Sequence, residues 1–214
     1  MVDLDRRYVA LIADVVASRE IRERITFDDR LLTRMNELSD QNPHIVSRYT
    51  LIGDEVQAVF SGTGFLFRDA VSILSAIHPV TMRFSYGVGT LIKPINPDQA
   101  IEMDGPAFHR ARDGVNELKE TGRLFTVVGN GVPQVELVRE ALRLVSHDME
   151  RWNENRVRTL AMRQQGVPVK EIAEELRVSD KAIYKTMDAG AVGVIIRLFD
   201  RIEEAIHKGV SGPI

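Results

Sequence analysis

The chain has 214 residues, of which 44% are hydrophobic and 28% are charged, and its formal net charge is −3. This composition is typical of an ordinary globular protein, and the slightly acidic balance argues against a general nucleic-acid coat. Cysteine is absent, which excludes disulfides and cysteine-based zinc sites. No apolar stretch reaches the roughly 18 residues of a membrane span, and the N-terminus lacks a signal-peptide pattern. We therefore expect a cytoplasmic protein with no membrane contact.

The first part of the chain predicts alternating strands and helices. A continuous apolar run at 7–15 indicates a central strand that is buried on both faces. Helical spacing of apolar residues at 27–39 and 65–77 predicts two helices. Further strands are expected at 46–52, 56–61, 82–89 and 123–128, and a third helix is expected from Phe108 to Leu118.

The expected order, β-α-β-β-α-β-α-β, defines an α+β fold with a βαββαβ core and with the helices on one face of a mixed sheet. The turn-rich segment "GNGVP" at 129–133 ends this region, and the chain beyond it has helical periodicity. We therefore expect two domains, an α+β domain at 1–130 and a helical domain at 131–214.

Acidic residues are expected to meet at one end of this sheet. Asp14 ends the first strand, and Asp54 and Glu55 lie in the hairpin "LIGDEVQAVF" at 51–60. Mg²⁺ prefers oxygen ligands and is commonly held by one or two carboxylates together with substrate phosphates. These three residues are therefore candidate magnesium ligands for phosphoryl or nucleotidyl transfer. The alternative is that Asp14 caps a turn and that Asp54 is an ordinary hairpin residue.

Candidate phosphate-binding residues lie near two helix starts. Ser18, Arg19 and Arg22 follow the first strand, near the place where a triphosphate would lie, and arginine binds phosphate well. Asp104 and Gly105 precede a helix whose N-terminus is suited to an anion. The alternative for the first group is a solvated helix start with surface ion pairs.

Several segments resemble class III nucleotidyl cyclases, in the same order, across roughly residues 7–128. "VALIADVVASR" resembles the cyclase strand that ends in a metal-binding Asp. "TLIGDEVQAVF" resembles the cyclase hairpin, and its Gly-Asp-Glu resembles that of GGDEF diguanylate cyclases. "RFSYGVGTL" and "GPAFHRAR" are similar to the strand and helix that follow. The resemblance implies a ferredoxin-like, cyclase-like palm domain with Asp14 and Asp54 as metal ligands and a nucleoside triphosphate as ligand or substrate.

The chain departs from the cyclase pattern at several positions. Thr50 lies where a purine-selecting Lys is often found, and His109 and Asp113 lie where cyclases carry an Asn and an Arg. Arg110 and Arg112 are candidate replacements in nucleotide binding. Loss of such groups removes transition-state stabilisation, so no catalytic residue is assigned.

The segment "VKEIAEELRVSDKAIYKTM" at 169–187 has a helix-turn-helix pattern, which we place at about 168–188. Ala173 allows close helix crossing, and Ser179 is suited to cap the second helix. Arg177 stands where many such turns carry Gly. The candidate DNA-binding residues are Ser179, Asp180, Lys181, Tyr184, Lys185 and, on the preceding helix, Arg163. The alternative is a tri-helical module that binds another protein.

Over its whole length the sequence is similar to the SatD family. The shared features are the Asp-Val-x-x-Ser-Arg segment, the Gly-Asp-Glu hairpin, "MDGPAFHRAR" and a C-terminal helix-turn-helix. We expect a DNA-binding regulator of double-stranded DNA that has a nucleotide- and magnesium-binding palm domain and acts as a homodimer, with a final amphipathic helix at 191–207 in core or dimer packing. The alternatives are a magnesium-dependent nucleotidyl cyclase or nucleotidyltransferase, and an assembly protein.

Overall fold

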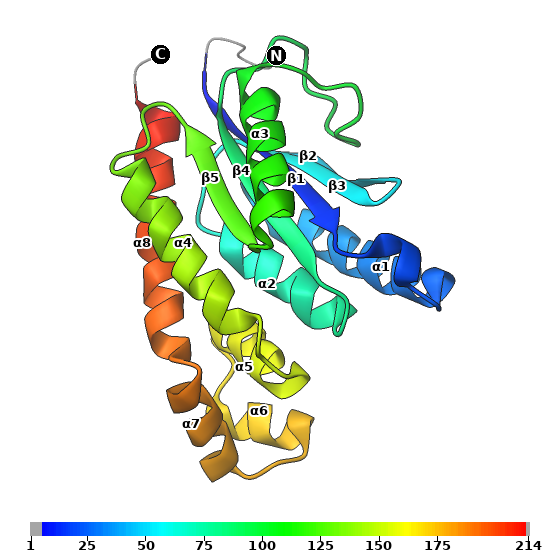
Figure 1. Ribbon diagram of the computed structural model, residues 1–214, viewed down its shortest axis with the longest axis vertical. Coiled ribbons are helices and arrows are strands. Elements are labelled where there is room, and N and C mark those ends of the chain that lie inside the picture. Colours follow the sequence, from blue (N-terminus) through cyan, green and yellow to red (C-terminus); the bar gives the residue numbers. More distant parts are fainter. Residues whose placement is uncertain (1–5, 213–214) are drawn as a thin grey trace.

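A five-stranded mixed sheet lies at the centre of the computed structural model, which describes residues 6–212 (Figure 1). Its strands are β1 (Tyr8–Val15), β2 (Ile45–Ile52), β3 (Glu55–Phe60), β4 (Met82–Gly89) and β5 (Phe125–Gly129). Their spatial order is β2-β3-β1-β4-β5, with antiparallel pairing throughout except for the parallel pair β4–β5. The predicted mixed sheet and the βαββαβ order along the chain are confirmed.

The helices in the described part of the chain lie close to the positions that apolar periodicity predicts. They are α1 (Arg24–Gln41), α2 (Leu66–Ile77), α3 (Pro106–Thr121), α4 (Val135–Met149), α5 (Glu154–Gln164), α6 (Val169–Leu176), α7 (Asp180–Ala189) and α8 (Val192–Ser211), with a short 3₁₀ helix at Ser18–Glu20. All helices from α4 onward follow the "GNGVP" segment, as expected.

Helices cover both faces of the sheet. The central strand β1 is therefore buried along its whole length. Val9, Leu11 and the other odd-numbered residues of β1 belong to the same hydrophobic cluster as α1 and α2. Tyr8, Ala10 and Ile12 pack with α3 instead, which crosses in front of the sheet in Figure 1. The prediction that the helices share one face is therefore wrong, since a strand with two apolar faces needs apolar cover on each.

α3 lies very close to β4 because glycine occurs on both sides of the contact. A Cβ atom on Gly87 of β4 would overlap the backbone carbonyl of Ala107. A Cβ atom on Gly114 of α3 would likewise overlap the hydroxyl of Ser85. This close approach brings the charged side chains in the second half of α3 down to the end of the sheet.

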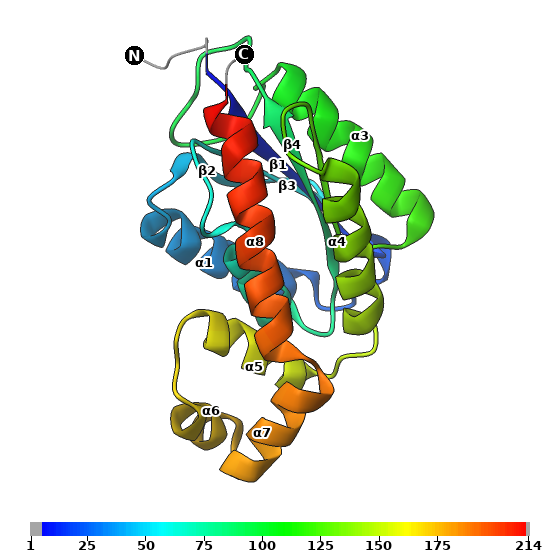
Figure 2. The ribbon, with the colours of Figure 1, turned by 90° about the vertical axis from the view of Figure 1, so that its left-hand side faces the viewer.

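The helices beyond residue 130 pack onto the same core as the sheet. α8 runs back along the molecule beside α4 (Figure 2), and the ring of Phe199 in α8 stacks on Phe67 of α2 with their centroids 4.5 Å apart. One hydrophobic cluster contains residues from the sheet and from α1, α2, α4, α5 and α8. The core is thus continuous across the expected boundary near residue 130, and that boundary stays a prediction.

α6 and α7 lie at one end of the molecule, and α7 contacts α8 (Figure 1). Their buried side chains, Ile172, Ala173, Leu176 and Ile183, form a hydrophobic cluster separate from the main core. Across residues 6–212, none of the helices has both the length and the apolar character that crossing a membrane requires.

Candidate functional site

Charged side chains from three strands and one helix gather at the end of β1. Asp14 of β1 lies opposite Glu55 of β3 on one side and opposite Arg83 of β4 on the other. Directly opposed residues of neighbouring strands project from the same face of a sheet, and α3 covers this face with Arg112 and Lys119. We call these five residues the sheet charge cluster.

Asp14 is the most buried member of the sheet charge cluster, with 4% of its surface exposed. Arg83 Nη1 donates to Asp14 Oδ2 at 3.0 Å, and Lys119 Nζ lies 2.8 Å from Asp14 Oδ1. Arg112 donates to Glu55, and this hydrogen bond raises the pKa of Arg112 above its ordinary value. A buried carboxylate needs such partners, because an unpaired buried charge is costly. The two oxygens of Asp14 are therefore both engaged by cationic side chains.

Asp54 lies beside this cluster but in a different environment. It follows Gly53, whose φ of 67° is a left-handed conformation that favours glycine in the β2–β3 turn. The side chain of Asp54 is exposed, and its Oδ2 accepts a hydrogen bond from Ser18 Oγ at 2.9 Å. The structure therefore joins two predicted site residues, Ser18 and Asp54, at the tip of the hairpin.

The three predicted magnesium ligands have suitable oxygen donors, but their arrangement does not fit a resident ion. Asp14 is paired with two cations, Glu55 with Arg112, and Asp54 with Ser18. No group of three or more His, Cys, Asp or Glu side chains is placed to hold a metal ion anywhere in residues 6–212. Octahedral Mg²⁺ needs converging oxygen ligands, so no chemical step is assigned to it, and magnesium binding stays a prediction.

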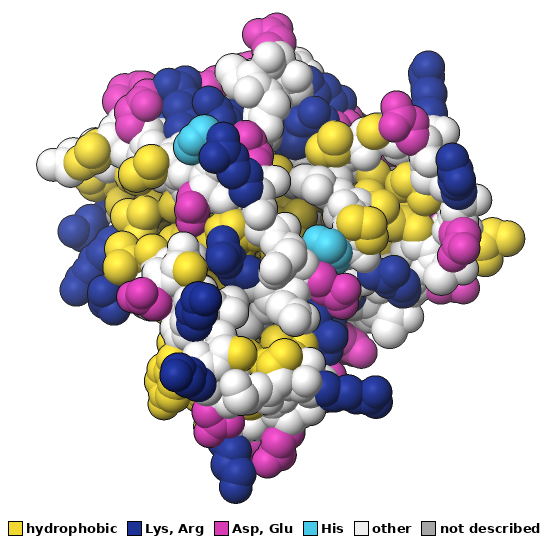
Figure 3. Space-filling model, turned by 60° about the horizontal axis from the view of Figure 1, so that its bottom comes forward, with side chains coloured by type: hydrophobic (Ala, Val, Ile, Leu, Met, Phe, Trp, Pro, Cys, Tyr) yellow, Lys and Arg dark blue, Asp and Glu magenta, His cyan; other side chains and the backbone are white. Residues whose placement is uncertain are grey.

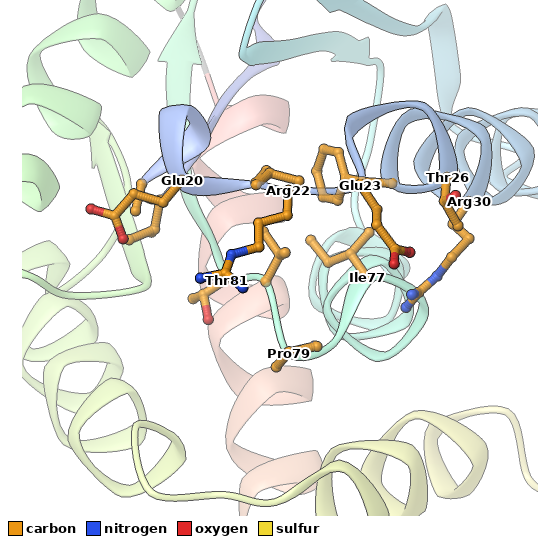
Figure 4. Close-up of a pocket in the computed structure, with 13 residues that line it drawn as sticks. Glu20, Arg22, Glu23, Thr26, Arg30, Ile77, Pro79 and Thr81 are labelled. Atoms are coloured by element: carbon orange, nitrogen blue, oxygen red, sulfur yellow. The ribbon is translucent and has the colours of Figure 1, made fainter.

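Arg22 lines a pocket beside the end of β1. Figure 4 shows Arg22, Glu23 and Arg30 extending in the same direction from the α1 side of this pocket. The pocket has a volume of about 440 Å³ and apolar walls from Phe27, Ile77 and Pro79, among others. Arg19 is exposed and does not line this pocket. Of the predicted residues Ser18, Arg19 and Arg22, only Arg22 lines this cavity, whose wall has both charged and apolar side chains.

Asp104, Gly105 and Arg110 lie at the other end of the sheet. Gly105 has a φ of 135° and begins α3 next to Thr90, just beyond the end of β4 that pairs with Tyr8. Tyr8 and Asp14 are at opposite ends of β1, about 20 Å apart at 3.3 Å per residue. The predicted phosphate-binding residues therefore form two separate groups rather than one site.

Asp104, Gly105 and Arg110 are engaged in hydrogen bonds within the protein. The backbone N–H of Gly105 donates to Asp104 at 2.7 Å, and this bond lowers the pKa of Asp104. His109 lies 2.8 Å from the same carboxylate. Arg110 donates to the carbonyl of Val88 at 2.5 Å. These bonds fix the start of α3 against the end of β4.

The turn between α6 and α7 contains the helix cap that the sequence predicts at Ser179. Ser179 Oγ accepts a hydrogen bond from the backbone N–H of Ala182 at 3.2 Å and caps α7. Arg177 adopts φ 55° and ψ 45°, the left-handed conformation in which many such turns carry Gly. The two short helices are thereby held at a fixed angle over their own hydrophobic cluster.

α7 presents most of the predicted DNA-binding residues on its outer surface. Asp180, Lys181 and Lys185 are exposed, and Tyr184 has 61% of its surface exposed. Arg163 instead donates to the carbonyl of Val167 at 2.6 Å and is half-buried in the α5–α6 connection. Five of the six predicted DNA-binding residues are therefore exposed, and Arg163 is the exception.

Comparison with known proteins identifies the family. The SatD family model matches residues 8–206 of this chain. The chain belongs to the SatD family. No curated protein sequence matches this SatD-family chain.

Two solved structures show a distant likeness to this SatD-family chain. One is a bacterial light-regulated adenylyl cyclase, with a TM-score of 0.39 and 15% identity, where the match covers 57% of this chain and 42% of the cyclase chain. The other is a regulator of polyketide synthase expression from Bifidobacterium adolescentis, with a TM-score of 0.28 and 12% identity over 93% of this chain and 80% of that one. The chain thus spans less than half of the cyclase, and neither score is high enough to carry a functional argument.

Sequence reasoning missed three residues that organise this SatD-family chain. Arg83 and Lys119 form ion pairs with Asp14. The sequence indicates a role for Lys119 only through its seven-residue spacing from Arg112, which places both residues on one face of a helix. The third is Glu203 of α8, which is buried against the N-terminal end of α2. A single acid in an otherwise apolar helix stripe is the only sequence signal for it.

Proposed function

We propose that this SatD-family chain is a DNA-binding regulatory protein that contacts duplex DNA through α7. The observation that carries this proposal is the exposed face of α7, where Lys181, Tyr184 and Lys185 project from a capped helix. None of these three side chains has a hydrogen bond or ion pair within residues 6–212. A helix with free cations on its outer surface is suited to a polyanion.

The spacing of these residues supports entry of α7 into the major groove. Lys181 and Lys185 are four residues apart, so they lie on one side of the helix, about one turn apart. In helix-turn-helix proteins the second helix lies in the major groove with its first residues near base edges. Ser179 and Asp180 occupy that position here, where Asp180 can accept a hydrogen bond from a cytosine amino group.

The basic residues on α5 have a structural role in this proposal. Arg158 pairs with Glu175 of α6 at 2.8 Å, and Arg156 lies over the ring of Trp152 at 5.7 Å from its centroid. Arg163 is bonded to the backbone. Because these guanidinium groups are engaged, the phosphate contacts of the proposal come from α7 rather than from α5.

We propose as a second function that the sheet domain binds a nucleotide and so regulates the DNA-binding end. The cyclase-like segments at 7–15 and 50–60 support this, together with the pocket beside Arg22. The rival, a magnesium-dependent cyclase, is less well supported, because the carboxylate of Asp14 is paired with Arg83 and Lys119. Thermal stability with each of the four ribonucleoside triphosphates, with and without Mg²⁺, tests nucleotide binding, and product analysis of the same mixtures tests turnover.

DNA binding is tested by selecting bound fragments from a random-sequence duplex pool and measuring their affinity by fluorescence anisotropy. The double variant Lys181→Ala/Lys185→Ala is expected to bind at least about tenfold more weakly. The matched control is Lys93→Ala/Arg151→Ala, which removes the same charge from exposed positions outside α7. Equal loss in both variants would show that net charge, and not α7, governs binding.

A further inference from the structure

A second cavity lies between the sheet and α5, a helix that packs against α7. It has a volume of about 270 Å³, and we call it the junction cavity. Arg83 and Leu124 line it from the sheet side, and Met149, Trp152 and Val157 line it from the helical side. Figure 3 brings the end of the molecule with α6 and α7 forward and shows hydrophobic side chains recessed among charged ones.

Two of the side chains that line the junction cavity have an N–H group without a partner. Trp152 is 7% exposed, and its indole Nε1 is buried with no hydrogen-bond partner within residues 6–212. Nε of Arg83 is also buried and unpartnered in this part of the chain, although Nη1 of the same guanidinium donates to Asp14. Proteins satisfy the great majority of their buried donors, because an unmade hydrogen bond is costly. An acceptor that enters the junction cavity beside these side chains supplies what they lack.

The polar part of the wall favours an acceptor with negative charge. Arg83 belongs to the sheet charge cluster, in which three cationic side chains face two carboxylates. Among the described residues that line the junction cavity, Glu150 is the one acid, and its carboxylate pairs with Arg123 at 3.2 Å. The other polar side chains of the wall, His78 and Thr81, are able to donate hydrogen bonds. A carboxylate matches this set of donors, because hydrogen bonds to a charged acceptor are stronger than those to a neutral one.

The rest of the wall is apolar and sets the size and shape of the ligand. Leu74, Leu124, Met149 and Val157 line the junction cavity with side chains that belong to the main hydrophobic core. A cavity of about 150 Å³ admits benzene, so a volume of about 270 Å³ admits one aromatic ring together with its carboxylate. The indole of Trp152 and the thioether of Met149 are both favourable neighbours for an aromatic ring.

We propose that the junction cavity binds a small aromatic carboxylate. Its carboxylate accepts hydrogen bonds from Arg83 and Trp152, and its ring packs among the apolar side chains of the wall. Because Arg83 belongs to β4 and Trp152 to the connection between α4 and α5, the ligand joins the sheet to the helices beyond it. α5 packs against α7, so the ligand lies one helix away from the surface to which we assign DNA contact.

The junction cavity is separate from the pocket beside Arg22, to which we assign the nucleotide. Val16 and residues 79–81 line both, so the two cavities lie side by side. Of the two, Arg83 and Trp152 line only the junction cavity. Either ligand can bind if the other does not, and neither requires DNA contact by α7. The full chain without nucleotide or DNA is therefore the right sample for a test.

Trp152 provides the readout, because it is the only tryptophan of the chain. Its indole N–H gives a single cross-peak in a ¹H–¹⁵N correlation spectrum. Benzoate is the probe, and benzamide is its neutral counterpart of the same shape. Benzoate is expected to shift this cross-peak in a saturable manner and to bind at least about tenfold more tightly than benzamide. Nuclear Overhauser contacts are expected between the benzoate ring protons and the methyl groups of Leu124, Met149 and Val157.

The ratio of the two affinities separates contact with Arg83 from a structural effect, because loss of packing alone would weaken both probes equally. Arg83→Gln is expected to bring the ratio for benzoate over benzamide to about 1, whereas Arg83→Lys keeps the charge and is expected to keep benzoate preferred. Arg151→Gln is the matched control. It removes a charge from an exposed position next to Trp152 that does not line the junction cavity, and it is expected to keep the wild-type ratio.

The wild type alone is sufficient to overturn the proposal. An indole cross-peak that does not move in millimolar benzoate, or equal affinities for benzoate and benzamide, would do so. Ring contacts with Phe27 and Ile77, which line the pocket beside Arg22 and not the junction cavity, would also overturn it. A folded Arg83→Gln that keeps the wild-type ratio would contradict the contact between the carboxylate and Arg83.

Discussion

The carboxylate of Glu203, on α8, accepts a hydrogen bond from the backbone N–H of Phe67 in the first turn of α2, with 2.9 Å between the two atoms. The second carboxylate oxygen accepts from the backbone N–H of Gly64. This side chain is therefore the cap of α2, which has no side-chain cap of its own. It also fixes the long helix that follows α7 against the sheet domain.

Glu203 makes the stability of the fold pH-dependent. Burial, with added repulsion from Asp69 and Asp200, raises the pKa of Glu203 from 4.5 to about 7. The folded state then holds a proton that the unfolded state releases between these values, so this residue lowers the stability as pH rises from 4.5 through 7. Wild type is expected to lose about 3 kcal/mol of unfolding free energy between pH 4.5 and pH 8 through this residue, and Glu203→Gln is expected not to lose it. The difference in unfolding free energy between the variant and wild type therefore grows by that amount, in favour of the variant, as pH rises. Urea unfolding of both proteins at several pH values measures this difference in unfolding free energy. A difference that does not change with pH would contradict the prediction.

Asp14 is expected to stabilise the fold as a carboxylate. Asp14→Asn leaves Arg83 and Lys119 facing a neutral amide, which is expected to lower the free energy of unfolding by about 2 kcal/mol. This loss is smaller than for a fully buried ion pair, because the Lys119 side chain is 42% exposed. Asp54→Asn, at the exposed turn, is expected to change the free energy of unfolding by less than about 0.5 kcal/mol. Urea unfolding of the two variants gives the comparison, and equal effects would show that pairing of Asp14 is unimportant.

Mg²⁺ is expected to leave the melting temperature of the wild type unchanged, because the oxygens of Asp14 are already paired with cations. The measurement is a thermal melt with increasing millimolar Mg²⁺ for wild type and for Asp14→Asn. A magnesium-dependent rise that is present in wild type and lost in Asp14→Asn would contradict this expectation and establish the metal site that the sequence predicts.

The sequence predicts the fold better than it predicts the site, for physical reasons that particular residues show. Apolar periodicity located the strands and helices because it reports burial, which follows the backbone repeat. It did not place α3 on the far face of the sheet, although the unbroken apolar run of β1 required cover there. The cap at Ser179 was predictable because it is made within four residues. The partners of Asp14 were not predictable, because Arg83 and Lys119 lie 69 and 105 positions away from it in the sequence.

Close packing of α3 on β4 gives a further prediction. Gly87→Ala is expected to lower the free energy of unfolding by about 1–3 kcal/mol, because the added Cβ would overlap the carbonyl of Ala107. Gly193→Ala is the matched control: its nearest neighbour is the flexible end of Arg197 at 3.5 Å, so helix propensity is expected to raise stability by up to about 1 kcal/mol. Urea unfolding of both variants measures the difference, and a neutral Gly87→Ala would show that α3 can move away.

The cap of α7 is expected to contribute about 1 kcal/mol through the hydrogen bond from Ala182 to Ser179. Ser179→Ala removes the acceptor, whereas Ser179→Asp keeps one at the same position. Native-state hydrogen exchange of α7 amides is the suitable measurement, because α6 and α7 have a hydrophobic cluster of their own and can open without the main core. Equal exchange in the two variants would show that the cap is not needed.

The salt dependence of DNA affinity tests the central claim, contact of α7 with duplex DNA, most directly. Each phosphate contact contributes about −0.9 to the slope of log K against log salt concentration. Anisotropy titrations across a salt series are expected to give a slope for Lys181→Ala/Lys185→Ala that is shallower than that of wild type by about 2 for each bound chain. The control Lys93→Ala/Arg151→Ala is expected to keep the wild-type slope. Parallel lines for wild type and Lys181→Ala/Lys185→Ala would contradict contact between these lysines and DNA.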